Sequence, residues 1–206
     1  PMAVGAHVYL LGKVPSPKIL LKAFEEVKPN LILTVPLILE KIYKKMILPQ
    51  LSKTTMKVAL NIPLLDSRIY AQIRKKLVDA FGGRFREVIV GGAAMNEEVT
   101  NFLYKIKFPF TIGYGMTECG PLISYDHNDE YVPGSCGQIL KGIMKVRIDS
   151  EDPYNKVGEI QVSGENVMKG YYKNEEATSK VFTEDGWLRT CLLYTSPSPR
   201  DGLLSR

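Results

Sequence analysis

Short apolar runs alternate with amphipathic stretches over the first half of the chain. Residues 17–27 carry apolar side chains at helical spacing, preceded by the capping hydroxyl of Ser16 and opened by a proline. Residues 31–35 form an apolar run long enough for a buried strand, and a second helical pattern, also opened by a proline, covers residues 36–46. This alternation predicts a mostly parallel sheet flanked by helices.

The alternation repeats further along. A helical pattern begins at the capping side chain of Asp66 and ends at a pair of glycines, and residues 87–90 form the next short strand. Asn96 begins another helix with two glutamates near its positive end, and residues 110–112 make the following strand. Both strands run into glycine-rich loops. Because ligands bind at the carboxyl ends of strands in open α/β sheets, we expect a ligand site at these loops.

The pattern changes beyond Pro133. Residues 145–149 and 158–163 alternate in the manner of β-strands, with Gly and Pro between them. The segment from Leu192 onward is rich in serine and proline and has the period of neither strand nor helix. We therefore predict a partial α/β core over residues 1–132, a β-rich subdomain of the same domain over residues 133–190, and a disordered or non-native tail over residues 191–206.

Composition and charge exclude several classes of protein. The 206 residues are 45% hydrophobic and 24% charged, as in a soluble globular domain or part of one. The apolar runs are too short for a transmembrane helix, and the three cysteines lack the spacing of a zinc site or a disulfide framework. Residues 1–86 carry 15 Lys and Arg against 5 Asp and Glu, and residues 87–206 carry 12 against 17. The basic part would suit anionic lipid or nucleotide phosphates, but its amphipathic spacing favours a solvated helix face.

The strongest candidate chemistry lies in Gly113-Tyr114-Gly115-Met116-Thr117-Glu118, taken together with Gly91-Gly92-Ala93-Ala94 in the preceding loop. A nucleotide phosphate needs close backbone approach, which glycine permits, a hydroxyl donor such as Thr117, and a hard oxygen ligand for magnesium such as Glu118. A purine needs a flat apolar face, which Tyr114 offers, beside backbone groups such as those of residues 92–94. Each motif alone is also common as a plain tight turn.

Together the two motifs resemble the signatures of the adenylate-forming superfamily, which includes acyl-CoA synthetases, luciferases and peptide-synthetase adenylation domains. Two later tracts resemble the next family signatures in the same order, namely residues 158–164 followed by Gly170-Tyr171-Tyr172, and then Gly186-Trp187-Leu188-Arg189-Thr190. Residues 34–43 resemble a segment of long-chain fatty acyl-CoA synthetases. Leu37 stands where many of these relatives have an arginine, which leaves the chain-length class open.

The resemblance implies a fold and a set of roles. The fold is the three-layer α/β core of an adenylate-forming N-terminal domain, in part, with a β-rich subdomain after it. The implied roles are the backbone of Gly92, Ala93 and Ala94 beside adenine, Tyr114 stacked on adenine, Thr117 on the α-phosphate, Glu118 on Mg²⁺, and Gly113, Gly115 and Met116 completing the nucleotide loop. An apolar channel for the acyl chain would run beside residues 113–115, where small residues leave room.

The implied reaction has two halves. A fatty acid carboxylate attacks the α-phosphorus of ATP and expels pyrophosphate, and the thiolate of coenzyme A then displaces AMP from the acyl-adenylate. ATP, Mg²⁺, coenzyme A and a fatty acid are therefore the expected cofactors and partners, and nucleic acid is not. We expect a cytoplasmic location, with peripheral contact with the inner membrane surface left open.

Some family parts are not expected in this chain. In the family, the Gly-Trp-Leu-Arg-Thr tract continues into Gly-Asp, whose aspartate holds the ribose of ATP, whereas Cys191 and Leu192 follow Thr190 here. An upstream phosphate loop and a C-terminal catalytic lysine are also missing. Residues after about Thr190 resemble translated sequencing-adapter read-through, and we expect them to be foreign to the parent protein. We expect the chain to be an internal fragment that is inactive alone.

Two other functions remain open. One is a non-catalytic nucleotide-binding scaffold that kept the sheet and lost the catalytic parts. The other is an adenylation enzyme that hands the acyl group to a carrier protein instead of coenzyme A.

Overall fold

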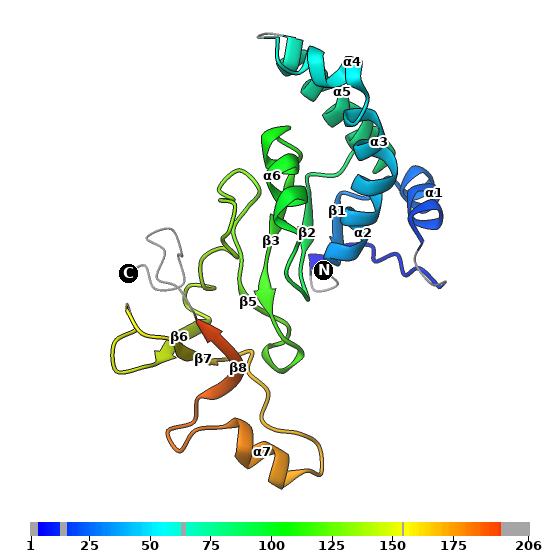
Figure 1. The fold of residues 1–206 in the computed structure, drawn as a ribbon. Coiled ribbons are helices and arrows are strands. Elements are labelled where there is room, and N and C mark those ends of the chain that lie inside the picture. The colour runs from blue at the N-terminus through cyan, green and yellow to red at the C-terminus, as the bar shows by residue number, and fades with distance from the viewer. Residues whose placement is uncertain (1–3, 13–15, 63–64, 154, 195–206) are drawn as a thin grey trace. The chain divides into compact units, whose positions relative to one another are not determined.

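The computed structural model describes residues 4–12, 16–62, 65–153 and 155–194. The chain divides into two compact units (Figure 1). Unit 1 comprises Pro1–Ile89 and Ala93–Phe110, and unit 2 comprises Val90–Gly92 and Thr111–Arg206. Among the described residues, no helix has both the length and the apolar character needed to cross a membrane.

A three-stranded sheet is central to the first half of the chain. Its order is β1 (Leu31–Thr34), β2 (Glu87–Val90) and β3 (Phe110–Ile112). Val88 donates its N–H to the carbonyl of Pro109 at 3.0 Å, and the N–H of Gly113 donates to the carbonyl of Val90 at 2.9 Å. Because the partners of β2 advance along β3 in the same direction, the two strands are parallel. The predicted α/β class with a parallel sheet is confirmed.

The helices of the first half are short except for α1 and α5. They are α1 (Pro17–Val27), α2 (Pro36–Ile42), the π-helix η2 (Tyr43–Ile47), α3 (Leu48–Leu51), α4 (Thr54–Ala59), α5 (Leu65–Ala80) and α6 (Glu97–Lys105). The single helix predicted over residues 36–46 is interrupted by η2. Pro49 lies one turn further on, and since it has no N–H to donate, the regular ladder cannot pass through it unchanged.

The structure confirms the predicted capping residue at two helix starts and contradicts it at a third. The Ser16 hydroxyl accepts from the N–H of Ile19 at 3.3 Å, and the Asn96 side chain accepts from the N–H of Val99 at 3.2 Å, as predicted. The prediction that Asp66 caps α5 is wrong. Asp66 lies inside the first turn, and its carboxylate accepts from the N–H of the next residue instead.

Aromatic packing holds unit 1 together. The rings of Phe81, Phe85 and Phe108 lie with centroids 5.5 to 5.9 Å apart, and Phe24 of α1 stacks on Phe81 at 5.2 Å. Gly82, directly after Phe81, has a φ of 93°, and a Cβ there would overlap the carbonyl oxygen of Phe24. Glycine at this position therefore lets the end of α5 approach α1.

The strand β1 is less buried than its sequence suggests. The whole run over residues 31–35 is apolar enough for a buried strand, but Ile32 alone within β1 is buried, and Leu33 is 66% exposed. The strand lies at the edge of the three strands, and alternate side chains of a strand point to opposite faces. Ile32 therefore faces the core while its neighbours face outward.

Unit 2 is rich in β-structure, and its bounds differ from those of the β-rich subdomain predicted over residues 133–190. It contains β4 (Tyr114–Gly115), the 3₁₀ helix η3 (Thr117–Cys119), β5 (Leu122–Ser124), β6 (Met144–Asp149), β7 (Gly158–Gly164), the helix α7 (Glu175–Val181) and β8 (Leu188–Tyr194). The strands β6, β7 and β8 form an antiparallel sheet. The sequence patterns did not predict α7 or β8.

The end of β8 corrects one expectation. Leu192 to Tyr194 were expected to lie in neither strand nor helix, but they continue β8, where Tyr194 pairs with Gly158 and Leu193 with Glu159. The physical reason is that Tyr194 is buried with Val162 and other apolar side chains of unit 2, so pairing is accompanied by burial. Residues 195–206 lie outside the described residues, and the non-native origin of the tail remains a prediction.

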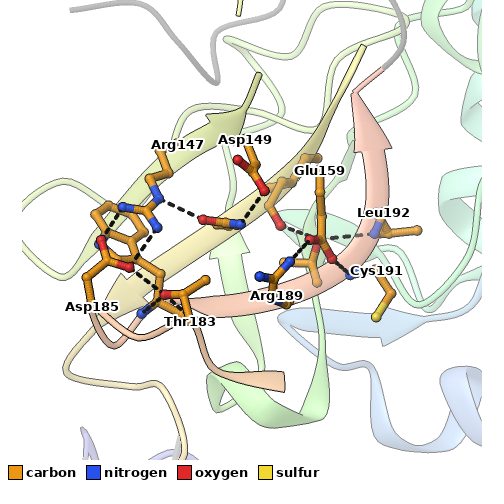
Figure 2. A network of polar contacts seen from close by, with 12 residues as sticks. Arg147, Asp149, Glu159, Thr183, Asp185, Arg189, Cys191 and Leu192 are labelled. Atoms are coloured by element: carbon orange, nitrogen blue, oxygen red, sulfur yellow. Dashed lines mark hydrogen bonds and ion pairs between the residues drawn. The ribbon is translucent and has the colours of Figure 1, made fainter. Parts of the chain in front are cut away.

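A polar network joins the strands of this sheet (Figure 2). The guanidinium of Arg147 on β6 pairs through two nitrogens with the carboxylate of Asp185, donates to the side chain of Gln161 at 2.7 Å and lies 4.5 Å from the centroid of the Trp187 ring. The Thr183 hydroxyl donates to Asp185 at 2.6 Å and accepts from the N–H of Trp187 at 2.8 Å. Hydrogen bonds from Arg147 and Thr183 hold the pKa of the Asp185 carboxyl well below its usual range.

We expect the pair between Arg147 and Asp185 to survive mild acid and to break in strong acid. A depressed folded pKa means that Asp185 contributes stability above its unfolded pKa of about 3.9, and that this contribution is lost as the pH falls through the folded value. Trp187 is the only tryptophan, so its emission reports the change. Emission should stay constant from about pH 7 down to about pH 4, the usual carboxyl range, and change only as the pH falls well below it.

The matched control is Asp185→Asn, which keeps the side-chain shape and removes the titrating group. At neutral pH its Trp187 emission should already resemble that of the acidified chain. An acid transition identical to that of the unchanged chain would show that another group controls the emission.

Candidate functional site

The two glycine loops meet at the carboxyl ends of β2 and β3. Gly91 and Gly92 follow β2, and Gly113 follows β3 and donates its N–H to the carbonyl of Val90 at 2.9 Å. A Cβ on Gly91 would lie 3.5 Å from the carbonyl oxygen of Gly113, and Gly92 has a φ of 89°. The loops therefore lie side by side at the carboxyl ends of the strands, where ligands bind in open α/β sheets. Gly92 is exposed, whereas Gly113 is buried. Ala93 and Ala94 continue the first loop and are exposed.

Gly115 has a structural task that its motif did not reveal. Together with Tyr114 it forms β4, which pairs with β5 through an irregular register. A Cβ at Gly115 would overlap the carbonyl oxygen of Pro121, the residue of the cis Gly120–Pro121 bond. Pro121 therefore fills the space on the Cβ side of Gly115, and the acyl channel expected beside residues 113–115 stays a prediction.

Tyr114 lies half-buried against the apolar core of unit 2, which includes Cys119, Ile123 and Leu188. Its hydroxyl is buried and has no hydrogen-bond partner in the described part of the chain. Burial raises the pKa of Tyr114, and the nearby Thr190 hydroxyl offsets part of the rise. The Thr190 hydroxyl donates its proton to the carbonyl of Ile160 at 2.8 Å, so that proton is not available to the Tyr114 oxygen.

We expect Tyr114→Phe to leave the stability of the chain unchanged within about 0.5 kcal/mol or to raise it, because an unpartnered buried hydroxyl is removed. Tyr114→Ala should instead destabilise unit 2 by about 2 kcal/mol, since ring packing is lost. Urea unfolding followed by Trp187 emission measures both. A clear loss of stability in the Phe variant would mean that the hydroxyl has a partner in solution.

Thr117 and Glu118 are the groups of the second loop that can reach a ligand. Thr117 begins η3, its side chain is exposed, and its hydroxyl bonds to no described residue. Glu118 is half-exposed, and its Oε1 accepts a hydrogen bond from the Tyr171 hydroxyl at 2.9 Å. Met116, just before η3, packs half-buried against the core of unit 2 and so supports the turn.

The donor set fits magnesium bound together with a nucleotide. Within the described ranges, no group of three or more His, Cys, Asp and Glu side chains is arranged to hold a metal ion. Magnesium in nucleotide enzymes is commonly held by one or two carboxylates together with phosphate oxygens and water. Glu118, with one carboxylate oxygen unengaged by described residues, would be that carboxylate.

Cys119 and Tyr171 are neighbours of the site that sequence reasoning left without a role. The Cys119 thiol is fully buried, and burial with the adjacent Glu118 charge raises its pKa to about 11, so it is not a reactive thiolate. Tyr171 belongs to the Gly170-Tyr171-Tyr172 motif that resembled a family signature. Its place in that motif was the only sequence signal for it.

A shallow recess elsewhere does not compete as the site. It lies in unit 1 and is lined by Met46, Ile47, Gln50, Ile73, Lys76 and Leu77. The lining is mostly apolar and brings no set of polar groups to one point, and none of the glycine-loop residues takes part. The glycine loops are therefore the candidate site because of the polar groups beside them, and not because they form a pocket.

Comparison with known proteins identifies a family. The family described as AMP-binding enzyme matches residues 1–172. The chain is 29% identical over 183 residues to long-chain-fatty-acid–CoA ligase 1 of Saccharomyces cerevisiae, which covers 81% of this chain and 26% of that protein. It is 34% identical over 141 residues to 4-coumarate-CoA ligase 1 of Narcissus pseudonarcissus, covering 62% of this chain and 26% of that protein. The chain thus spans about a quarter of the length of these curated relatives.

Solved structures agree on the fold. The structure of ATP-bound MatB from Rhodopseudomonas palustris matches with a TM-score of 0.61 at 24% identity, over 89% of this chain and 31% of that one. At this identity the likeness establishes the fold alone. With the family match extending over residues 1–172 and the signatures in the family's order, this chain belongs to the AMP-binding enzyme family.

Proposed function

We propose that the parent protein of this chain is an AMP-forming acid–CoA ligase that activates a long-chain fatty acid. The observation that carries the proposal is the contact between two glycine loops beside the exposed Thr117 hydroxyl and the half-exposed Glu118 carboxylate. This is the arrangement that binding of nucleotide phosphates with magnesium requires.

Each residue has a proposed task in the first half-reaction. The Thr117 hydroxyl donates to an α-phosphate oxygen, where negative charge builds as the fatty acid carboxylate bonds to phosphorus and pyrophosphate leaves. Glu118 would hold magnesium, which when bound offsets phosphate charge. Tyr114 and the backbone of residues 92–94 hold the adenine. Gly113, Gly115 and Met116 keep the loop backbone in place.

The second half-reaction transfers the acyl group. The sulfur of coenzyme A bonds to the acyl carbon of the acyl-adenylate, and AMP leaves. A carrier protein in place of coenzyme A, or a scaffold without turnover, are the competing functions.

The proposed substrate class rests on the share of this chain that aligns with each relative and on the segment of residues 34–43. The yeast long-chain ligase aligns with 81% of this chain, whereas the 4-coumarate ligase of Narcissus pseudonarcissus aligns with 62%. Residues 34–43, which resemble the long-chain type, form the end of β1 and all of α2. The higher identity to 4-coumarate ligases, 34% against 29%, makes an aromatic acid the second candidate.

The test measures acid-dependent exchange of pyrophosphate into ATP by the full-length parent with palmitate, 4-coumarate or acetate, followed by thioester formation with coenzyme A or a carrier protein. We expect palmitate-dependent exchange and palmitoyl-CoA. Exchange with 4-coumarate alone would establish the aromatic substrate, thioester on the carrier alone would establish the carrier function, and binding of ATP without exchange would establish the scaffold. Residues 1–206 alone should form no acyl-CoA.

We also propose a cytoplasmic location for the parent, because ATP and coenzyme A are drawn from that compartment. Peripheral membrane contact would follow from an apolar acyl substrate. Fractionation of cells that express the parent tests both, and release of membrane-bound protein by salt would identify electrostatic contact.

A further inference from the structure

The segment 166–171, which follows β7, lies along the turn that carries Glu118. The side-chain amide of Asn166 donates to the carbonyl of Cys119 and, at 2.9 Å, to the carbonyl of Leu122. The N–H of Met168 donates to the carbonyl of Glu118 at 2.7 Å. Backbone and side-chain hydrogen bonds therefore attach this segment to the carbonyl of Glu118 and to two carbonyls that follow it.

The backbone of Tyr171 is held in place by a contact with α7. Its N–H donates to the Thr178 hydroxyl on α7 at 2.9 Å, and that hydroxyl in turn donates to the carbonyl of Asn174 at 2.8 Å. Gly170 has a φ of 149°, and a Cβ there would lie 2.7 Å from the Thr178 side chain, so glycine allows this close approach. The backbone of Tyr171 is thus held by α7, while its ring reaches back to Glu118.

The hydroxyl of Tyr171 engages one oxygen of the Glu118 carboxylate. Tyr171 donates to Oε1 at 2.9 Å, and Oε2 bonds to none of the described residues. A neutral donor fixes the rotation of a carboxylate without neutralising its charge, and this interaction raises the pKa of Tyr171. Magnesium prefers strict octahedral geometry and takes few protein oxygens, so a carboxylate with one fixed and one unengaged oxygen suits it.

We propose that Tyr171 is a positioning residue for the metal ligand, holding Oε1 of Glu118 so that Oε2 faces the cation of the metal–nucleotide complex. This rests on the proposed function, because it assigns the cation to Glu118. Hydrogen bonds to ligating carboxylates typically change metal affinity about 10-fold to about 100-fold when removed. If the Tyr171 hydroxyl instead competes with the cation for the Glu118 carboxylate, its removal should make the cation bind more tightly.

The test is Tyr171→Phe in the full-length parent, with Mn²⁺ as the probe and a non-hydrolysable ATP analogue. The signal of free Mn²⁺ in electron paramagnetic resonance measures binding without turnover. We expect affinity for Mn²⁺ to fall about 10-fold. Unchanged or tighter binding overturns the proposal.

The matched control is Tyr172→Phe on the neighbouring residue. Tyr172 is 88% exposed, its ring lies 5.2 Å from the Lys173 amine, and the hydroxyl bonded to Glu118 is that of Tyr171. Its Mn²⁺ affinity should match that of the unchanged protein. Equal losses in the two variants would assign the effect to the segment as a whole and overturn the role given to the Tyr171 hydroxyl.

A double-mutant comparison separates positioning from folding. In a Glu118→Gln background, Tyr171→Phe should cause no further loss of Mn²⁺ affinity, because the hydroxyl acts through that carboxylate. A further loss of the same size overturns the proposal. A parent that binds no Mn²⁺ with nucleotide overturns both this inference and the proposed function, whereas one that binds Mn²⁺ but activates no acid overturns the proposed function alone.

Discussion

Glu118→Gln in the full-length parent is expected to reduce acid-dependent pyrophosphate exchange about 100-fold. A neutral amide would hold magnesium more weakly than a carboxylate does, and magnesium is needed to offset the negative charge of the phosphates. The fold should remain intact. The Glu118 side chain is half-exposed, and among the described residues its one side-chain hydrogen bond comes from the Tyr171 hydroxyl. The amide oxygen of glutamine can still accept this bond. Exchange at saturating Mg²⁺ and ATP measures the loss.

Glu130→Gln is the matched control for this substitution. Glu130 is an exposed carboxylate of the same unit that belongs to neither glycine loop. It should exchange pyrophosphate at the rate of the unchanged protein. If Glu118→Gln keeps a normal rate, Glu118 is not the metal ligand, whatever the family resemblance implies.

Gly115→Ala is expected to destabilise unit 2 by about 3 kcal/mol or more, the upper range for a side chain forced into filled space. The added methyl group would overlap the carbonyl oxygen of Pro121 and lie 2.9 Å from its carbonyl carbon, both of which are backbone atoms. The β4–β5 hairpin must open to admit it. Urea unfolding followed by Trp187 emission reports this loss, because Trp187 lies in the same unit.

Gly134→Ala separates overlap from backbone strain. Gly134 has a φ of 85°, and a Cβ there would meet nothing within 4 Å. Its replacement should cost about 1 kcal/mol, the usual penalty for a left-handed backbone alone. A Gly115 variant no less stable than the Gly134 variant would show that the hairpin yields to the methyl group.

Structural features that depend only on residues close together in the sequence were predicted correctly. The hydroxyl of Ser16 and the amide of Asn96 cap helices a few positions away, and the short apolar strands over residues 87–90 and 110–112 have the predicted bounds. Capping and side-chain period depend on groups within one helical turn or one strand, so they can be recognised without knowing what packs against them. The order of the motifs likewise indicated the family.

Features that depend on distant residues were decided by the tertiary structure. Tyr171 and Glu118 are hydrogen-bonded although 53 positions separate them in the sequence, and Arg147 and Asp185 are paired although 38 positions separate them. No local sequence pattern predicts either contact. Gly115 shows the same principle, because its motif indicated only a ligand loop, whereas in the folded chain the space on its Cβ side is filled by Pro121. The apolar end of β8 gained its strand conformation from pairing with β7. Local sequence therefore determined the capped helix starts, the short parallel strands and the family, whereas contacts between segments far apart in the chain determined which atoms of the candidate site are engaged and which are available to a ligand.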